Sequence, residues 1–138
     1  MLEFNLFLID YWYFSVPLFF FIFLFAYSEM NKGGKKIEPN ELTRLVNKES
    51  AILIDLRKKE DYENGHIMNA LNYPHQEFDN QMHELEKFKD RPIILVCDMG
   101  RNSANIGEKL KKAEFEKTFR LNGGMMTWIQ ENLPVIQK

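Results

Sequence analysis

The chain has 138 residues, which suits one compact domain of ordinary size, and its net charge of −2 argues against a nucleic-acid-binding protein. Its single cysteine, Cys97, excludes an intrachain disulfide. The three histidines lack the spacing and the partner cysteines of a structural zinc site, so we expect no metal.

The first thirty residues differ in composition from the rest of the chain. Residues 11–28 form an uncharged run of 18 residues, six of them Phe, bounded by Asp10 and Glu29. As a helix this run would span about 27 Å, close to the roughly 30 Å hydrocarbon core of a bilayer. We therefore expect residues 1–30 to be an N-terminal membrane anchor with one transmembrane helix over about residues 11–28.

Two other interpretations of this run are weaker. A cleaved signal peptide would carry a basic segment before the apolar one, which is missing, and residues 25–28 make a poor cleavage site. A buried core helix is disfavoured because this run is apolar on all sides and too rich in aromatic residues.

The charges that flank the run predict its orientation. Glu3 and Asp10 precede it without any Lys or Arg, and Lys32, Lys35 and Lys36 follow it. The positive-inside rule then places the N-terminus outside and everything after residue 30 in the cytoplasm. We expect residues 31–36 to be a short linker, made flexible by its glycine pair, with lysines that can contact anionic lipid head groups.

Residues 37–138 alternate apolar runs with amphipathic patterns. A helix is predicted to start at residues 38–41, where Pro39 and an acidic first turn favour it. Strands are then predicted over 51–54, 70–72, 93–96 and 117–121, and helices over 60–64, 78–88, 103–112 and 125–132. This alternation predicts an α/β fold, with a parallel sheet and helices on both of its faces.

Two polar segments directly follow predicted strands. Residues Asp55-Leu56-Arg57 follow the strand 51–54, and Cys97 follows the strand 93–96. Ligands of parallel α/β sheets bind beyond the carboxyl ends of the strands, so both segments belong to the candidate active edge. Taken alone, a lone cysteine at a strand end is more often a small buried hydrophobe. Here it faces a predicted helix N-terminus across a short loop, where backbone N–H groups and the helix dipole favour the nucleophilic thiolate.

The soluble part resembles the rhodanese-like domain family over about residues 37–136. Three sets of residues carry this resemblance, in the right order and with the right spacing. They are Asp55-Leu56-Arg57, Glu60, Tyr62, Gly65-His66-Ile67, Ala70, Asn72 and Pro74; then Cys97, Gly100 and Ser103; and finally Leu121, Gly123-Gly124, Trp128 and Leu133-Pro134-Val135. One anchor followed by one such domain (37–138) also resembles a group of small bacterial inner-membrane proteins.

The resemblance implies a rhodanese-like parallel sheet flanked by helices, preceded here by one transmembrane helix, and it implies sulfur transfer. In the family, the loop thiolate takes the outer sulfur of thiosulfate or of another persulfide. The resulting persulfide, here on Cys97, passes that sulfur to cyanide or to a thiol acceptor. No metal or organic cofactor is implied.

The loop after the cysteine is expected to hold the anionic substrate through its backbone N–H groups. It consists of Asp98, Met99, Gly100, Arg101, Asn102 and Ser103. We expect Gly100 to permit a sharp turn and a close backbone approach, and Ser103 to cap the helix and donate to the loop. Asp55, Arg57 and His66 are expected to support the active edge structurally rather than to react.

The loop departs from the family pattern in two ways. Asn102 stands where family loops often carry Arg or Lys, and Arg101 lies one place earlier. Asp98 directly follows the cysteine, where a carboxylate would oppose the thiolate and repel thiosulfate. A neutral or persulfide donor is therefore as good a candidate as thiosulfate.

Two other functions compete with sulfur transfer. The domain could be a catalytically weak interaction module, tethered to the membrane and binding a membrane-protein partner. Phosphatase chemistry, which a related fold supports, would need Arg at the position of Ser103 and a loop one residue longer, so it is disfavoured.

Overall fold

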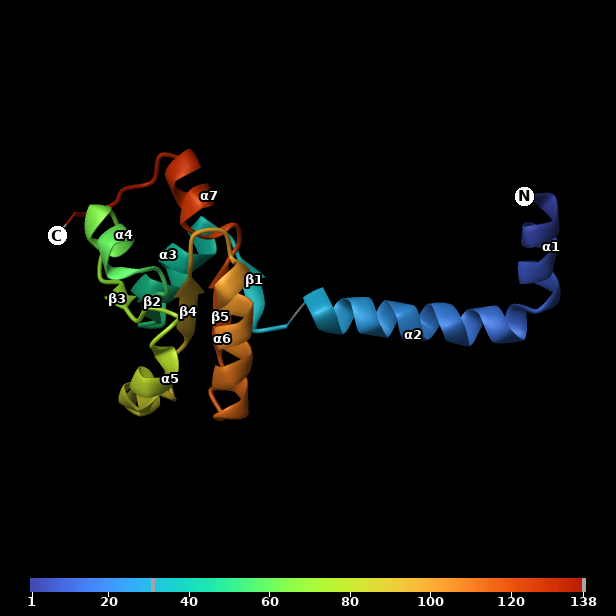
Figure 1. Ribbon diagram of the computed structural model, residues 1–138, viewed down its shortest axis with the longest axis horizontal. Coiled ribbons are helices and arrows are strands. Elements are labelled where there is room, and N and C mark those ends of the chain that lie inside the picture. The colour runs from blue at the N-terminus through green and yellow to red at the C-terminus, as the bar shows by residue number, and fades with distance from the viewer. Residues whose placement is uncertain (31, 138) are drawn as a thin grey trace. The chain divides into compact units, whose positions relative to one another are not determined.

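The computed structural model describes residues 1–30 and 32–137, except for the side chain of Arg101. The chain divides into two compact units, residues 1–31 and 32–138, and each is described by itself. In the first unit, helix α1 (Leu2–Asp10) is followed by helix α2 (Trp12–Met30) (Figure 1). The sequence pattern did not predict α1.

Helix α2 contains nearly all of the predicted span. It has 19 residues and a mean hydropathy of 1.5, and none of its side chains is buried. It continues through Pro17, which lies in its second turn. By length and composition α2 is a candidate membrane span, although a signal sequence near an N-terminus has the same properties.

The second unit is built on a sheet of five parallel strands in the order β1-β5-β4-β2-β3. The strands are β1 (Lys35–Ile37), β2 (Ile52–Asp55), β3 (Leu71–Asn72), β4 (Ile93–Val96) and β5 (Thr118–Leu121). Central strand β4 is buried along its whole length, because helices cover both faces of the sheet. The predicted fold class is confirmed.

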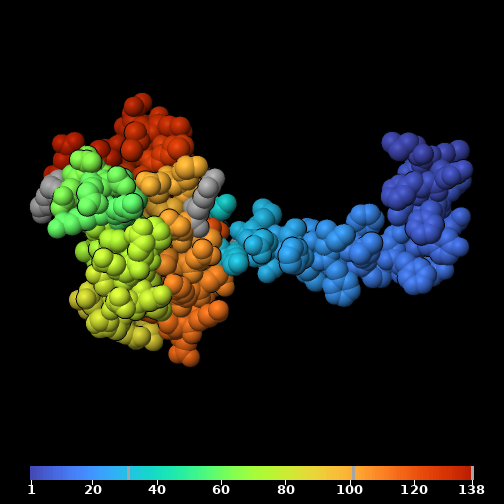
Figure 2. All heavy atoms as spheres, viewed as in Figure 1, coloured from blue at the N-terminus to red at the C-terminus, as the bar shows by residue number. Residues whose placement is uncertain are grey.

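Each face of the sheet has its own apolar core. Helices α3 (Pro39–Lys48) and α7 (Gly124–Gln130) contribute Leu42, Leu45, Met125 and Trp128 to one core. The other core lies under α5 (Phe78–Gln81), the 3₁₀ helix η1 (Met82–Phe88) and α6 (Arg101–Lys112). Figure 2 shows α6 in orange beside the yellow-green α5 region on this face, where Lys109 Nζ lies 2.9 Å from Asp79 Oδ1. Helix α4 (Lys59–Asn64) follows β2 and ends at Gly65.

Two segments of the second unit have a different secondary structure from the one predicted. The helix predicted over 78–88 is an α-turn followed by 3₁₀ helix, which fits the spacing of Met82, Leu85 and Phe88 at three residues per turn. In the segment predicted as a flexible linker, Gly33 and Gly34 are buried, and Lys35 and Lys36 belong to β1.

A close backbone contact explains why this glycine pair is packed. A Cβ on Gly107 of α6 would lie 1.8 Å from the Gly33 carbonyl oxygen. The two backbone segments can therefore lie this close only because both positions are glycine. The Gly33 N–H also donates to Glu108 Oε1 at 2.6 Å. The glycines therefore hold the start of the domain against α6.

Candidate active site

The sheet brings the two polar segments together at one edge. Strands β2 and β4 are neighbours, with Asp55 paired to Val96, and the Leu56 N–H donates to the Val96 carbonyl at 2.7 Å. Asp55-Leu56-Arg57 and Cys97 therefore leave adjacent strands at the carboxyl edge. The sequence predicted the shared edge, and the structure adds that the two strands are neighbours.

Cys97 lies at the base of a tight loop and is only 3% exposed. The Gly100 N–H donates to its Sγ at 2.8 Å, so a backbone dipole points at the sulfur. Gly100 has φ +88°, which an L side chain rarely adopts. A Cβ there would meet nothing closer than 3.9 Å, so the turn, and not a close backbone approach, requires the glycine.

Helix α6 begins earlier than predicted, at Arg101 rather than at Ser103. Gly100 is therefore the N-cap residue, and Ser103 lies within the first turn. The Ser103 hydroxyl is buried and donates to the Gly100 carbonyl at 2.8 Å. Ser103 thus donates to the loop as expected, but it closes the loop from inside the helix and does not cap it.

The remaining loop residues differ in exposure. Asp98 and Met99 are exposed, and Asn102 is half-buried. The side chain of Arg101, the basic residue one place before Asn102, lies outside the described part of the chain. Because Asp98 is exposed, water and salt screen its charge from a substrate in the loop.

Helix α7 holds the loop from the other side, a role that the sequence pattern did not predict. The N–H groups of Met125 and Met126 donate to the carbonyls of Cys97 and Asp98 at 2.7 and 3.0 Å. A Cβ on Gly124 would lie 2.1 Å from the Cys97 carbonyl oxygen. In the sequence, the glycine pair 123–124 was the signal for this contact. Only a glycine lets the backbone of α7 approach the backbone of the cysteine loop this closely.

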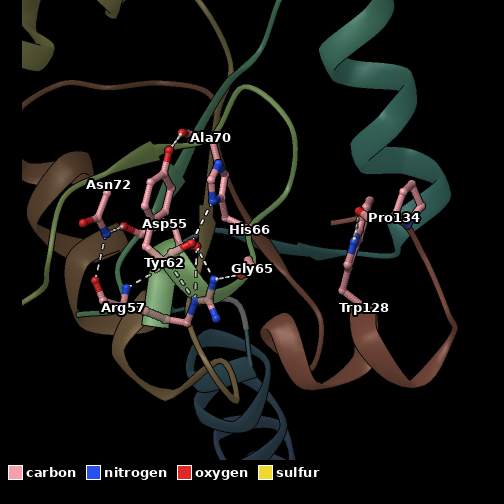
Figure 3. A network of polar contacts seen from close by, with 9 residues as sticks. All are labelled: Asp55, Arg57, Tyr62, Gly65, His66, Ala70, Asn72, Trp128 and Pro134. Carbon is pink, nitrogen blue, oxygen red and sulfur yellow. Dashed lines mark hydrogen bonds and ion pairs between the residues drawn. The ribbon is translucent and has the colours of Figure 1, made fainter. Parts of the chain in front are cut away.

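A buried ion pair stabilises the neighbouring end of β2. Arg57 lies between Asp55 and the Gly65 carbonyl, as Figure 3 shows. The closest guanidinium–carboxylate contact, from Arg57 Nη2 to Asp55 Oδ2, is 2.9 Å, and Arg57 Nη2 also donates to the Gly65 carbonyl at 2.6 Å. Asn72 adds hydrogen bonds to the carbonyls of Asp55 and Arg57.

His66 belongs to this supporting network and not to the cysteine loop. Its Nδ1 lies 2.8 Å from the Tyr62 carbonyl, so Nδ1 carries the proton and donates. Its ring stacks on the Tyr62 ring, with centroids 3.8 Å apart. The Tyr62 hydroxyl in turn donates to the Ala70 carbonyl at 2.6 Å, and burial raises the pKa of this phenol.

Arg120 is a charged residue near the loop that sequence reasoning missed. It is 5% exposed in β5, and its Nε donates to the Gly34 carbonyl at 3.1 Å. Burial lowers its pKa, and the negative charges of Cys97 and Glu108 act in the opposite direction. The signal was an arginine inside a short apolar strand, where parallel sheets normally carry apolar side chains.

The described residues contain no group of three or more His, Cys, Asp or Glu side chains placed to hold a metal ion. The site brings together the Cys97 thiol, the Gly100 N–H that donates to it and the nearby buried Arg120 guanidinium. Fold and site together define the class of this protein: an α/β domain with a buried cysteine in a tight loop at the carboxyl edge of a parallel sheet.

The chain belongs to the rhodanese-like domain family, whose model matches residues 38–131. It is 35% identical to protein YibN of Escherichia coli (strain K12), over 88% of this chain and 86% of that one. It is 28% identical to the thiosulfate sulfurtransferase GlpE of Shewanella oneidensis, over 71% of this chain and 95% of that one.

Solved structures agree with this assignment. A rhodanese-related protein from Thermoplasma volcanium superposes with a TM-score of 0.68 and 25% identity, over 75% of this chain and 99% of that one. The rhodanese-like domain protein of Staphylococcus aureus gives a TM-score of 0.65 and 26% identity, over 75% of this chain and 98% of that one.

Proposed function

We propose that this protein is a membrane-anchored sulfurtransferase or persulfide carrier that transfers sulfane sulfur through Cys97. The observation that carries the proposal is the hydrogen bond from the Gly100 N–H to Cys97 Sγ at 2.8 Å. A donor aimed at the sulfur stabilises negative charge on a thiolate or a persulfide. The similarity to GlpE proteins, thiosulfate sulfurtransferases by name, supports the same reaction.

In this reaction the protein contributes the Cys97 thiol and the backbone N–H donors of its loop. The Cys97 thiolate attacks the outer sulfur of the donor, a new S–S bond forms, and the old S–S bond breaks. With thiosulfate as donor, sulfite leaves with the electron pair of the broken bond. A thiolate acceptor then attacks the outer sulfur of the persulfide and releases the Cys97 thiolate.

Mass spectrometry of the intact full-length protein in detergent tests this function. After incubation with thiosulfate or an organic persulfide, we expect one added sulfur on the wild-type chain, lost again when a thiol is added. The Cys97→Ser variant, which changes one atom, should gain none. Failure of every donor to add sulfur to folded wild-type protein would sink the proposal.

We also propose that α2 crosses the bacterial inner membrane with the N-terminus outside. The apolar composition of α2 and the lysines that follow it support this topology. The match to YibN over 88% of the chain extends beyond the rhodanese-like domain, so it includes part of the first thirty residues.

Cysteine labelling tests the topology. In a Cys97→Ser background, a membrane-impermeant maleimide should label Asn5→Cys on intact spheroplasts and should label Gln137→Cys only after lysis. The reverse pattern would show the opposite orientation, and labelling of both positions before lysis would argue against a span.

A binding module remains a second candidate because the domain has an apolar cavity away from Cys97. Its volume is about 230 Å³, and its lining includes Leu42, Val46, Ile67 and Trp128. A membrane-protein partner could insert an apolar side chain there. Full complementation of a deletion strain by Cys97→Ser would favour this function over sulfur transfer.

A further inference from the structure

A small cavity lies beside the cysteine loop, between the loop and strands β1 and β5. Its volume is about 160 Å³, and its lining includes Lys36, Gly100, Ser103 and Arg120. One water needs roughly 10–15 Å³ of such space, so the cavity has room for a small oxyanion. Gly100 links it to the thiol, because its N–H donates to Cys97 Sγ at 2.8 Å.

The sheet register places two cations together on the face that carries Cys97. Lys36 in β1 pairs with Arg120 in β5, and Arg120 pairs with Leu95 in β4. Paired residues of parallel strands point to the same face, and Leu95 and Cys97 lie in the same apolar core. Lys36, Arg120 and the thiol therefore share one side of the sheet.

Two like charges at paired positions repel each other, and burying one of them costs solvation energy. Glu108 offsets part of this charge, but its carboxylate also accepts the Gly33 N–H and lies 4.0 Å from Lys111 Nζ. An anion in the cavity would be attracted by both cations. The N-terminus of α6, a helix of 12 residues that begins at the loop, adds partial positive charge there.

We propose that Lys36 and Arg120 form a subsite that binds the oxyanion end of an anionic sulfur donor, such as the sulfonate group of thiosulfate, next to Cys97. This inference rests on the proposed sulfur transfer and assigns its substrate class. The two cations take over the task of the basic residue that is absent at Asn102, and they oppose the effect of Asp98. With the sulfonate held there, the Cys97 thiolate attacks the outer sulfur and sulfite leaves with the bonding electrons.

The test compares Lys36→Gln with Lys35→Gln on the full-length protein in detergent. Both lysines are exposed in β1 and the charge change is the same, but successive strand residues point to opposite faces, so Lys35 lies on the other side of the sheet. Thiosulfate, a dianion, adds one sulfur to Cys97 and releases sulfite. A neutral dialkyl trisulfide reacts with the same thiolate to form a mixed disulfide and releases an alkyl persulfide anion. The rate of Cys97 modification is measured with each reagent.

We expect Lys36→Gln to lower the rate at which Cys97 reacts with thiosulfate by about five- to tenfold. This is the effect of losing one charge contact near the surface. It should change the trisulfide rate less than about twofold, as expected for a neutral reagent in the same loop. Lys35→Gln should leave both rates unchanged. Arg120→Gln should act like Lys36→Gln, and Arg120→Lys, which keeps the charge, should restore part of the rate if the variant folds.

A second readout does not depend on sulfur transfer. Anionic iodoacetate and neutral iodoacetamide both alkylate Cys97, and the ratio of their rates reports the local potential. We expect Lys36→Gln, but not Lys35→Gln, to lower the ratio of the iodoacetate rate to the iodoacetamide rate. Equal effects of the two variants, or equal loss of rate with thiosulfate and the trisulfide, would overturn the subsite. A chain that accepts sulfur from no donor but keeps the difference in alkylation would instead contradict the proposed function alone.

Discussion

At the scale of single residues, the buried Asp55–Arg57 pair and the Cys97 thiol have different tasks at the same edge. The ion pair is almost fully buried, with side chains 1% and 7% exposed, and it bridges to the Gly65 carbonyl. A buried charge that loses its partner keeps its desolvation cost without compensation. The pair therefore maintains the end of β2, next to which the cysteine loop begins.

Replacing Arg57 by Ala should leave the Asp55 carboxylate buried without its cation and lower the free energy of unfolding by about 3–5 kcal/mol. The measurement is urea unfolding of the full chain in detergent, followed by circular dichroism. Arg44→Ala is the control, because the ion pair of Arg44 with Glu41 is exposed, so the unfolding midpoint should hardly move. Similar midpoints for both variants would contradict the structural role of the buried pair.

At the scale of elements, the active loop depends on α6 and α7 together. Helix α6 provides the Gly100 turn and the Ser103 hydroxyl, and α7 donates two N–H groups to the loop carbonyls. These contacts fix the backbone on both sides of the thiol. The orientation of Sγ is thus set by packing between elements and not by the loop sequence alone.

Gly124→Ala should destabilise the protein more than Gly100→Ala does. Both glycines have positive φ, which costs a non-glycine residue about 1–2 kcal/mol. At Gly124 the new Cβ would also lie 2.1 Å from the Cys97 carbonyl oxygen, whereas at Gly100 the nearest atom is 3.9 Å away. Thermal unfolding of both variants checks the order, and Gly124→Ala should also slow alkylation or sulfur loading of Cys97. Equal melting temperatures would show that α7 can shift without cost.

At the scale of the whole molecule, the proposed anchor and the rhodanese-like domain have separate physical requirements. The domain buries its apolar side chains in two cores on either side of the sheet. Helix α2 buries none of its own side chains, so its apolar surface needs another apolar environment. A bilayer would provide one.

A charge at the centre of α2 should therefore weaken membrane integration. Phe21→Lys places an ammonium group at the middle of the helix, where such a charge costs about 2.5–3.5 kcal/mol. Ser28→Lys places the same charge near the end, where the side chain can reach the head groups. We expect carbonate extraction to release more of the Phe21→Lys protein than of the Ser28→Lys protein. Equal retention of both would argue against a transmembrane α2.

Several features of the protein followed from the sequence alone. Apolar runs and helical periodicity predicted strands β2 to β5 and most helices, because these signals are local and depend on burial. The place of Cys97 between a strand and a helix, and the Gly and Ser residues of the loop, predicted a reactive site at the carboxyl edge. The uncharged run at 11–28 predicted α2 in the same way.

Other features were decided only by the tertiary structure. Strand β1 has three residues, two of them lysines, and exists because β5 offers its free edge. The pairing of Lys36 with Arg120, and the contact of α7 with the Cys97 loop, join segments that lie far apart in the chain. Short-range patterns cannot specify such contacts, because strand order and backbone approach depend on how the whole sheet packs. The sequence thus predicted a reactive thiol and placed it at a sheet edge, and the packing determined which charges surround it.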